Sequence, residues 1–278
     1  MMLTRTLRSQ CAMPALGLGT WPIKGPKCID LVRTGLESGF RLIDTAQMYT
    51  NEVSTGMGIA QSGVNRHDIF LTTKVVGCNQ GKLTRESVEM SLERLGTDYL
   101  DLILIHWPNP SLGRAEATWE TLANVREEGL TMSIGLSNFS LTQYDALVDA
   151  TGVEADVNQV QIDPWARQSE LVDGLLERGV MPQAWGPLGT RAARHNTELD
   201  WSVLETVAAR HGVSPHAIAL ADQLGRGFAT VVRSSNPEHQ LANLKALEIE
   251  LTDQDKADLA GMAQETVHLY DSTVEEEF

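Results

Sequence analysis

Residues 84–108 read TRESVEMSLERLGTDYLDLILIHWP and combine two patterns in one short stretch. The first half repeats its apolar residues at helical spacing, which predicts an amphipathic helix over residues 84–95 with Thr84 as its N-cap. The second half is an apolar run at residues 99–105 that predicts a buried strand, and this strand leads directly into His106. A helix followed at once by a buried strand is typical of an α/β fold with parallel strands.

The same alternation extends in both directions along the chain. Apolar runs of strand length recur about eight times, with helical patterns between them, and a (β/α)₈ barrel takes about 250 residues. The predicted strands are Ala15–Leu18, Arg41–Ile43, Ile69–Thr72, Tyr99–Ile105, Met132–Leu136, Val157–Ile162, Val180–Ala184 and Ala229–Val232.

An open, doubly wound sheet also fits this alternation, and it would favour a glycine-rich phosphate loop after the first strand. The nearest candidate is GLGTWP at residues 17–22, which lacks the third glycine of GxGxxG and has Pro22 where the helix should begin. We therefore predict an α/β fold of the (β/α)₈ TIM barrel class, formed as a single domain by residues 1–278.

Composition limits the kinds of partner that the chain can have. Its 278 residues are 42% hydrophobic, which is enough for a sizeable core, and the formal charge is 22 − 37 = −15. Such a charge repels the phosphates of nucleic acid and of anionic lipid, so we expect neither as a partner. The acidic stretch DSTVEEEF at residues 271–278 is predicted to be a solvated terminus.

The three cysteines, Cys11, Cys28 and Cys78, form no CxxC motif, and an odd number does not suggest a disulfide framework. We expect a reducing compartment and no metal site. The N-terminus lacks the apolar stretch of a secretory signal, and no segment approaches the ~20 uncharged apolar residues of a membrane span. The predicted protein is a cytoplasmic monomer.

Several predicted strands end in a residue that could take part in chemistry. Each has a structural alternative: Asp44 and Ser137–Asn138 could cap helices, Lys74 could lie on the surface, and His106 and the tryptophans could be core residues. The carboxyl ends of barrel strands converge on one face, where catalytic groups of such barrels lie. The residues concerned are Asp44, Lys74, His106, Trp107, Ser137, Asn138, Asn158, Gln159, Gln161 and Trp185.

This set suggests carbonyl reduction, because hydride transfer to a carbonyl leaves an oxygen that needs a proton. Tyr49 could donate it, although the usual tyrosine pKa of ~10 is high for transfer near neutral pH. A neighbouring Lys74 ammonium would favour the phenolate and lower that pKa, and Asp44 would keep the buried lysine charged. His106 could donate a hydrogen bond that orients the carbonyl oxygen.

The motifs around these residues resemble those of the aldo-keto reductase superfamily. The segment GFRLIDTAQMYTNE at 39–52 resembles its first signature, TTK at 72–74 its lysine strand and DYLDLILIHWP at 98–108 its histidine strand. Two more segments, IGLSNF at 134–139 and NQVQ at 158–161, resemble those that hold the nicotinamide amide. The resemblance runs from about Pro14 to Leu251 and is closest to the bacterial 2,5-diketogluconate reductases.

The resemblance implies a site residue by residue. Asp44, Tyr49, Lys74 and His106 would be the catalytic tetrad, and Trp21, Tyr49, His106 and Trp107 would bind substrate, with Trp165 as a further candidate at the mouth. The implied cofactor is NADPH, with NADH as the alternative, and the substrates are small aldehydes and ketones. The implied cofactor-binding residues are Ser137, Asn138, Gln159, Trp185, Gly186, Pro187, Leu188, Arg233, Ser234, Ser235, His239 and Asn243.

The cofactor segment VVRSSNPEH at 231–239 departs from the family's pattern. Arg233 stands where the family often has lysine, and His239 stands where it has an arginine that helps to bind the 2′-phosphate. Arginine binds phosphate as a permanently charged fork, whereas histidine has a shorter reach and a charge that depends on pH. This change weakens the expected preference for NADPH over NADH.

The residues leave three questions open. Substrates of the 2,5-diketogluconate type and of the methylglyoxal type both fit the resemblance. A nicotinamide-binding sensor would not need to keep the complete tetrad. A barrel isomerase or aldolase would need Lys74 as a neutral Schiff-base nucleophile, which a neighbouring Asp44 opposes.

Overall fold

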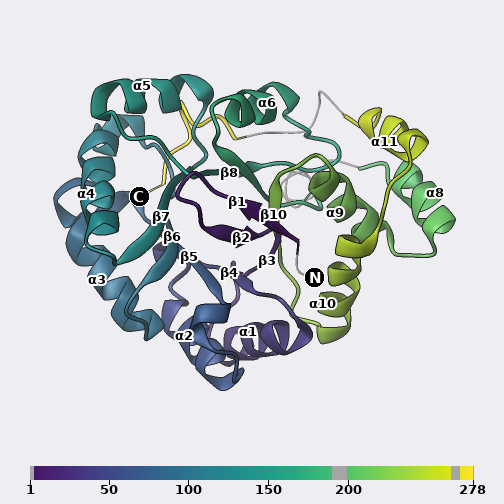
Figure 1. Ribbon diagram of the computed structural model, residues 1–278, viewed down its shortest axis with the longest axis horizontal. Coiled ribbons are helices and arrows are strands. Elements are labelled where there is room, and N and C mark those ends of the chain that lie inside the picture. The colour runs from purple at the N-terminus through teal and green to yellow at the C-terminus, as the bar shows by residue number, and fades with distance from the viewer. Residues whose placement is uncertain (1–2, 190–198, 264–269, 278) are drawn as a thin grey trace.

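The computed structural model describes residues 3–189, 199–263 and 270–277, and its centre is a closed barrel of eight parallel strands (Figure 1). The strands follow one another around the barrel in chain order, and β10 closes it by pairing with β3. All eight predicted strands are found, with ends that shift by up to three residues. They are β3 (Leu16–Gly19), β4 (Leu42–Asp44), β5 (Phe70–Val75), β6 (Leu100–Ile105), β7 (Thr131–Ser137), β8 (Val157–Gln161), β9 (Met181–Trp185) and β10 (Ala229–Val232).

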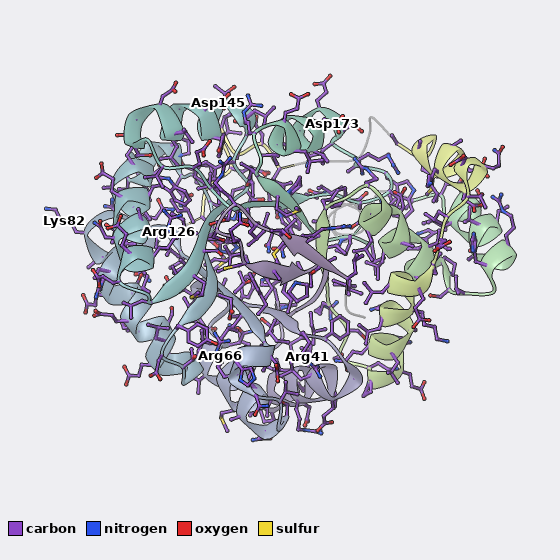
Figure 2. All side chains as sticks on the ribbon, viewed as in Figure 1. Arg41, Arg66, Lys82, Arg126, Asp145 and Asp173 are labelled. Carbon is purple, nitrogen blue, oxygen red and sulfur yellow. The ribbon has the colours of Figure 1, made fainter. Side chains whose placement is uncertain are left out.

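Helices surround the barrel and bury their apolar faces against its outer surface (Figure 1). Charged side chains lie on the outer side, as exposed Lys82 and Asp173 show in Figure 2. The described helices are α1 (Pro26–Ser38), α2 (Glu52–Gln61), α3 (Thr84–Leu95), α4 (Ala115–Glu127), α5 (Leu141–Thr151), α6 (Ser169–Glu177), α8 (Ser202–His211), α9 (Pro215–Gly225), α10 (Pro237–Leu244) and α11 (Asp253–Ala260).

Two helix starts differ from the sequence-based expectation. Thr84 is the first residue of α3 rather than its N-cap, because its hydroxyl donates to the carbonyl oxygen of Asn79 instead of accepting from the helix. Ser140, not Ser137 or Asn138, caps α5, and it forms a capping box with Gln143. The two preceding polar residues are therefore left for another role.

An N-terminal hairpin that the sequence patterns did not predict covers the amino end of the barrel. Its strands β1 (Thr4–Thr6) and β2 (Ala12–Pro14) pair antiparallel and lie across the barrel in Figure 1. Leu7 and Met13 of this hairpin are buried in one apolar cluster with residues of the barrel interior, such as Leu42. The hairpin therefore packs apolar side chains against the amino end of the barrel interior.

The other end of the barrel carries the loops that follow each strand. The segment of residues 270–277, here called the C-terminal tail, contacts the loop after β6 and the first turn of α5, and so lies at the carboxyl end. Among the described residues, none of the helices is long and apolar enough to cross a membrane.

Candidate active site

A buried lysine connects three elements at the carboxyl end of the barrel. Lys74, at the end of β5, has no exposed surface, and its Nζ donates to Asp44 Oδ1 at 2.7 Å and to the carbonyl oxygen of Thr45 at 2.9 Å. The same Nζ lies 3.4 Å from the hydroxyl of Tyr49, which belongs to the short turn η1 (Gln47–Tyr49) after β4. Lys74 is thus neither a surface residue nor free, because three acceptors surround its three donors.

Burial has the largest effect on the pKa values of Tyr49 and Lys74. It raises the pKa of Tyr49 well above its usual value, and the negative charges of Asp44 and Glu277 raise that pKa further. Burial also lowers the pKa of Lys74, although Asp44 and Glu277 oppose this change. The expected net lowering of the Tyr49 pKa by Lys74 is therefore not found, and the Tyr49 hydroxyl is protonated at neutral pH.

Tyr49 and His106 face one another across the cavity floor. Their rings meet edge to face with centroids 5.6 Å apart, and Trp21 contacts the other side of Tyr49 at 6.5 Å. Trp107, the residue after His106, faces the same space and packs on Tyr270 of the C-terminal tail at 5.0 Å. A small molecule between these rings would have an apolar wall and two polar groups within reach.

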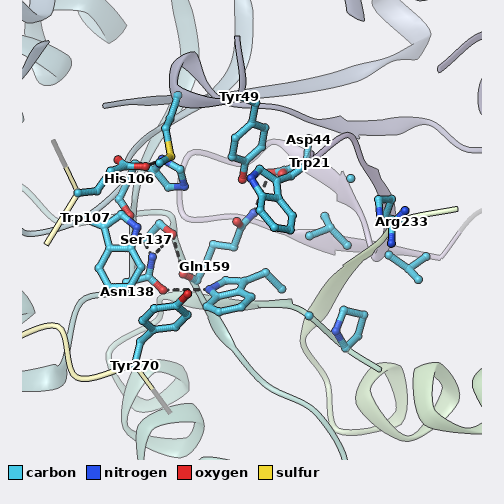
Figure 3. A pocket seen from close by; sticks show the side chains of 18 of the residues that line it. Trp21, Asp44, Tyr49, His106, Trp107, Ser137, Asn138, Gln159, Arg233 and Tyr270 are labelled. Carbon is cyan, nitrogen blue, oxygen red and sulfur yellow. Dashed lines mark hydrogen bonds and ion pairs between the residues drawn. The ribbon is translucent and has the colours of Figure 1, made fainter. Parts of the chain in front are cut away.

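Polar side chains at the ends of β7 and β8 and the Trp185 indole at the end of β9 line the next part of the cavity (Figure 3). Asn138 has a left-handed φ of 64°, and its amide donates to the His106 carbonyl oxygen and to Ser137 Oγ, both at 3.1 Å. Its Oδ1 accepts from Trp185 Nε1 at 2.9 Å, while Gln159 Nε2 donates to Asp44 Oδ2 at 2.8 Å. The amides are therefore already held in place, and Gln159 ties this region to the Lys74 cluster.

The segment after β10 forms the far end of the cavity. Arg233 lines it and is exposed, and Ser235 and His239 are exposed at the start of α10. Ser234 and Asn243 are buried at the same place, and the Ser234 hydroxyl contacts the backbone of residue 236. Helix α10 is capped by Asn236, and its N-terminus is a favourable place for an anion.

These parts enclose one cavity of about 510 Å³. Thirteen of the predicted site residues line it, whereas Lys74 lies behind Asp44, and residues 234, 235, 239 and 243 lie beyond Arg233. The predicted lining residues are Trp21, Asp44, Tyr49, His106, Trp107, Ser137, Asn138, Gln159, Trp185, Gly186, Pro187, Leu188 and Arg233, and the cavity is also lined by Gly19, Met48, Val231, Val232, Tyr270, Glu276 and Glu277.

The C-terminal tail closes one side of this cavity. The backbone N–H of Glu277 donates to Asn109 Oδ1 at 2.8 Å, and the Glu276 carboxylate accepts from the backbone N–H of Ser111 at 2.6 Å and from its hydroxyl. Gln143 at the start of α5 makes two hydrogen bonds with Ser272. The tail is therefore attached to the loop that follows β6 and to the start of α5.

The sequence and the structure each have known counterparts. The model of the aldo/keto reductase family matches residues 15–264, which is most of the chain. The chain belongs to the aldo/keto reductase family. This aldo-keto reductase is accordingly an oxidoreductase that acts on carbonyl groups.

Two similar proteins carry different substrate names. Methylglyoxal reductase DkgB of Escherichia coli O157:H7 is 36% identical over 255 residues, covering 90% of this chain and 93% of that protein. The 2,5-diketo-D-gluconic acid reductase B of a Corynebacterium species is 36% identical over 237 residues, covering 85% and 84%. A solved aldo-keto reductase from Bombyx mori in complex with NADP is 28% identical, with a TM-score of 0.87 and coverage of 94% and 93%.

Two expectations about this aldo-keto reductase are wrong. Trp165 does not line the cavity: it is 1% exposed, packs on Trp201 with centroids 5.0 Å apart, and donates to the carbonyl oxygen of Asp200. The tail is not simply solvated, because Ser272 and Glu277 are buried and are held by the contacts described above. Phe278 lies outside the described residues.

Sequence patterns missed the part of the site that the tail supplies. A run of carboxylates usually predicts a solvated segment, and its partners at Asn109, Ser111 and Gln143 lie more than a hundred residues away in the chain. The one local signal was Tyr270, an aromatic residue directly before the acidic run.

Proposed function

We propose that this aldo-keto reductase reduces small aldehydes and ketones to alcohols with NADPH, and that Tyr49 protonates the carbonyl oxygen. The observation that carries the proposal is the buried Lys74, whose Nζ lies 2.7 Å from Asp44 and 3.4 Å from the Tyr49 hydroxyl on the cavity floor. A proton donor must stay protonated until its substrate arrives, and the raised pKa of Tyr49 meets this condition.

The proposed roles of the neighbouring residues follow from charge. As negative charge develops on Tyr49 during proton transfer, the Lys74 ammonium stabilises it, so the lysine acts at the moment of reaction. Asp44 keeps Lys74 charged in spite of burial, and His106 faces the place where a carbonyl oxygen would accept from Tyr49. A Schiff-base role for Lys74 has less support, because Asp44, Thr45 and Tyr49 surround its amine.

The polar groups of the cavity fit a nicotinamide dinucleotide. One end has Ser137, Asn138 and Gln159 for a neutral amide beside the flat ring of Trp185, and the other end has Arg233 for phosphate. When bound, the nicotinamide would supply hydride to the carbonyl carbon. Both N–H groups of the Asn138 amide are in use, but its Oδ1 accepts only from Trp185 and could accept a second bond from the nicotinamide amide.

The segment beyond Arg233 would hold the 2′-phosphate that distinguishes NADPH from NADH. Ser234, Ser235 and His239 lie around the capped N-terminus of α10, Asn243 lies in its last turn, and Gly186, Pro187 and Leu188 line the cavity. The Arg233 guanidinium is available to bind this phosphate. NADPH is therefore the proposed cofactor and NADH the weaker alternative.

Several coarser properties complete the proposal. Methylglyoxal-type and diketogluconate-type carbonyls are both candidate substrate classes, as the names of the two relatives suggest. Residues 1–278 would act as one domain and as a monomer. The net charge of −15 and three free cysteines favour a cytoplasmic protein that does not bind nucleic acid.

Replacing Tyr49 by phenylalanine tests the proposal. Tyr49→Phe removes the proton donor and keeps the ring, so NADPH oxidation with methylglyoxal should fall by about 10²–10⁴-fold, the usual contribution of general acid catalysis. Tyr99→Phe is the matched control, because Tyr99 packs under Arg66, outside the residues that line the cavity. Near-normal turnover in folded Tyr49→Phe protein would remove Tyr49 from its role.

A further inference from the structure

The carboxylate of Glu277 lies inside the cavity rather than in solvent. The side chain is buried, and its Oε1 is 2.8 Å from His106 Nδ1. Neither carboxylate oxygen accepts a well-aligned hydrogen bond from any residue that the structure describes. With the His106 ring as its one close partner among the described residues, this buried carboxylate also acts on the groups around it, and it raises the pKa of both Tyr49 and Lys74.

The position of this carboxylate is determined by the backbone around it. The N–H of Glu277 is bonded to Asn109, which lies three residues after His106, and the preceding Glu276 is held by Ser111. Gly77 provides room for the tail, because a Cβ at this position would collide with the carbonyl oxygen of Glu277. The tail therefore holds the Glu277 carboxylate beside the His106 ring, which faces Tyr49.

The charged side chains that line the substrate part of the cavity are acidic. Among the described residues that line the cavity, Arg233 is the only lysine or arginine, and Figure 3 shows it on the opposite side from His106, Trp107 and Tyr270. The substrate side instead has the two carboxylates of Glu276 and Glu277. Among the described lining residues, an anionic substrate would meet like charge on that side and no lysine or arginine, since Lys74 lies behind Asp44 and is paired with it.

We propose that Glu277 determines substrate specificity by excluding anionic carbonyl compounds, so that this reductase acts on neutral aldehydes and ketones. The inference rests on the proposed function and decides between its two substrate classes in favour of the uncharged, methylglyoxal-type carbonyls. Two like charges about 6 Å apart at an effective dielectric of about 20 repel strongly enough to change affinity by roughly 10- to 100-fold.

The same charge acts on the proton donor. Tyr49 is faced by Asp44 from β4, Lys74 from β5, His106 after β6 and Glu277 from the tail. Glu277 raises the pKa of Tyr49, so removing its charge lowers that pKa. Reduction needs protonated Tyr49, and the loss of activity at high pH should therefore begin at lower pH when Glu277 is neutral.

The test compares 4-formylbenzamide with 4-formylbenzoate, two aldehydes of nearly equal shape that differ by one negative charge. Turnover with NADPH gives kcat/KM for each, and calorimetry gives their binding independently of turnover. We expect the wild type to favour the amide by at least about 10-fold, and Glu277→Gln to reduce this ratio to within about 3-fold by improving the benzoate. Glu120→Gln makes the same change of net charge on the exposed face of α4 and should leave the ratio unaltered.

The outcomes separate this inference from the proposed function. Equal use of both aldehydes by the wild type, or a ratio that Glu277→Gln does not change, would overturn the role of Glu277 even if reduction is efficient. Failure to reduce the amide at all would contradict the proposed function, and the two binding constants would then still decide charge selection. A purely structural role for Glu277 would lower kcat/KM for both aldehydes equally and leave the pH profile in place.

Discussion

Both ends of the barrel are covered by terminal segments of the chain, but with opposite chemistry. At the amino end, the β1–β2 hairpin inserts Leu7 and Met13 into an apolar cluster. At the carboxyl end, the tail contributes Tyr270, Glu276 and Glu277 to the wall of a cavity of about 510 Å³. The hairpin packs apolar side chains into the barrel interior, whereas the tail leaves a cavity with aromatic and acidic groups in its wall.

The difference shows which end is built for stability and which for chemistry. Packed apolar side chains at the amino end gain free energy from burial, and their loss leaves a void. At the carboxyl end, burial instead isolates Lys74, Asp44 and Glu277, which costs stability unless the charges are paired. Substitutions at the two ends should therefore separate into those that change folding and those that change rate.

The largest effect is expected at Lys74. Lys74→Met removes the ammonium that stabilises negative charge on Tyr49, so kcat/KM for a neutral aldehyde should fall by about 10²–10⁴-fold. The pKa of Tyr49, already raised by burial, should rise further, and the activity that remains should persist to higher pH.

The control for Lys74→Met is the double variant Lys74→Met/Asp44→Asn, which also removes the carboxylate left without its partner. It should regain stability in urea unfolding without regaining activity. A wild-type pH–rate profile in Lys74→Met would show that the lysine does not act on Tyr49. The assignment of chemistry to the carboxyl end of the barrel would then lose its main support.

A smaller effect, of the opposite kind, is expected at Met13. This side chain has no exposed surface, and Met13→Ala should lower the free energy of unfolding by about 2–5 kcal/mol while kcat stays within about twofold. Denaturant melts and steady-state kinetics measure both quantities. Val274→Ala at the other end, where the side chain is 74% exposed, should change neither, and a loss of activity in folded Met13→Ala would break the division between the two ends.

The smallest effect concerns the cofactor part of the carboxyl end. His239→Arg places a second guanidinium at the start of α10, and one charge-assisted hydrogen bond should tighten NADPH by about 10- to 100-fold with little change for NADH. Fluorescence quenching gives both dissociation constants. His67→Arg, at a highly exposed histidine, controls for the added charge, and an unchanged NADPH/NADH ratio would place residue 239 away from the 2′-phosphate.

The barrel was predictable because each strand carries its own signal. Runs such as 102–105 (LILI) are apolar along their whole length, since barrel strands are buried on both faces. The hairpin was missed because its strands are only three residues long and have mixed burial, with no pattern of period two to recognise. Its stability comes from the barrel interior that it covers, and no short window of sequence shows that.

The floor of the site was predictable for a similar reason. Asp44, Lys74 and His106 interrupt or end apolar strands, where a polar side chain is costly without a purpose. Glu277 gives no such signal, because an acidic run is ordinary in a solvated segment. Trp165 was misplaced because a large aromatic residue after a strand fits a core as well as a cavity wall, and only packing against Trp201 decides.

Gly77 makes the cavity wall sensitive to a single methyl group. A Cβ there would meet the backbone carbonyl of Glu277 and the side-chain amide of Asn109, which is buried and bonded to the N–H of Glu277. Alanine at position 77 would thus push the tail away from the barrel. The acidic wall that the tail provides would then be lost, and the cavity would be open on that side. In an engineered or diverging relative, a change at this one backbone contact would alter the range of accepted substrates. The strands of the barrel and the four residues of the proposed tetrad would stay the same.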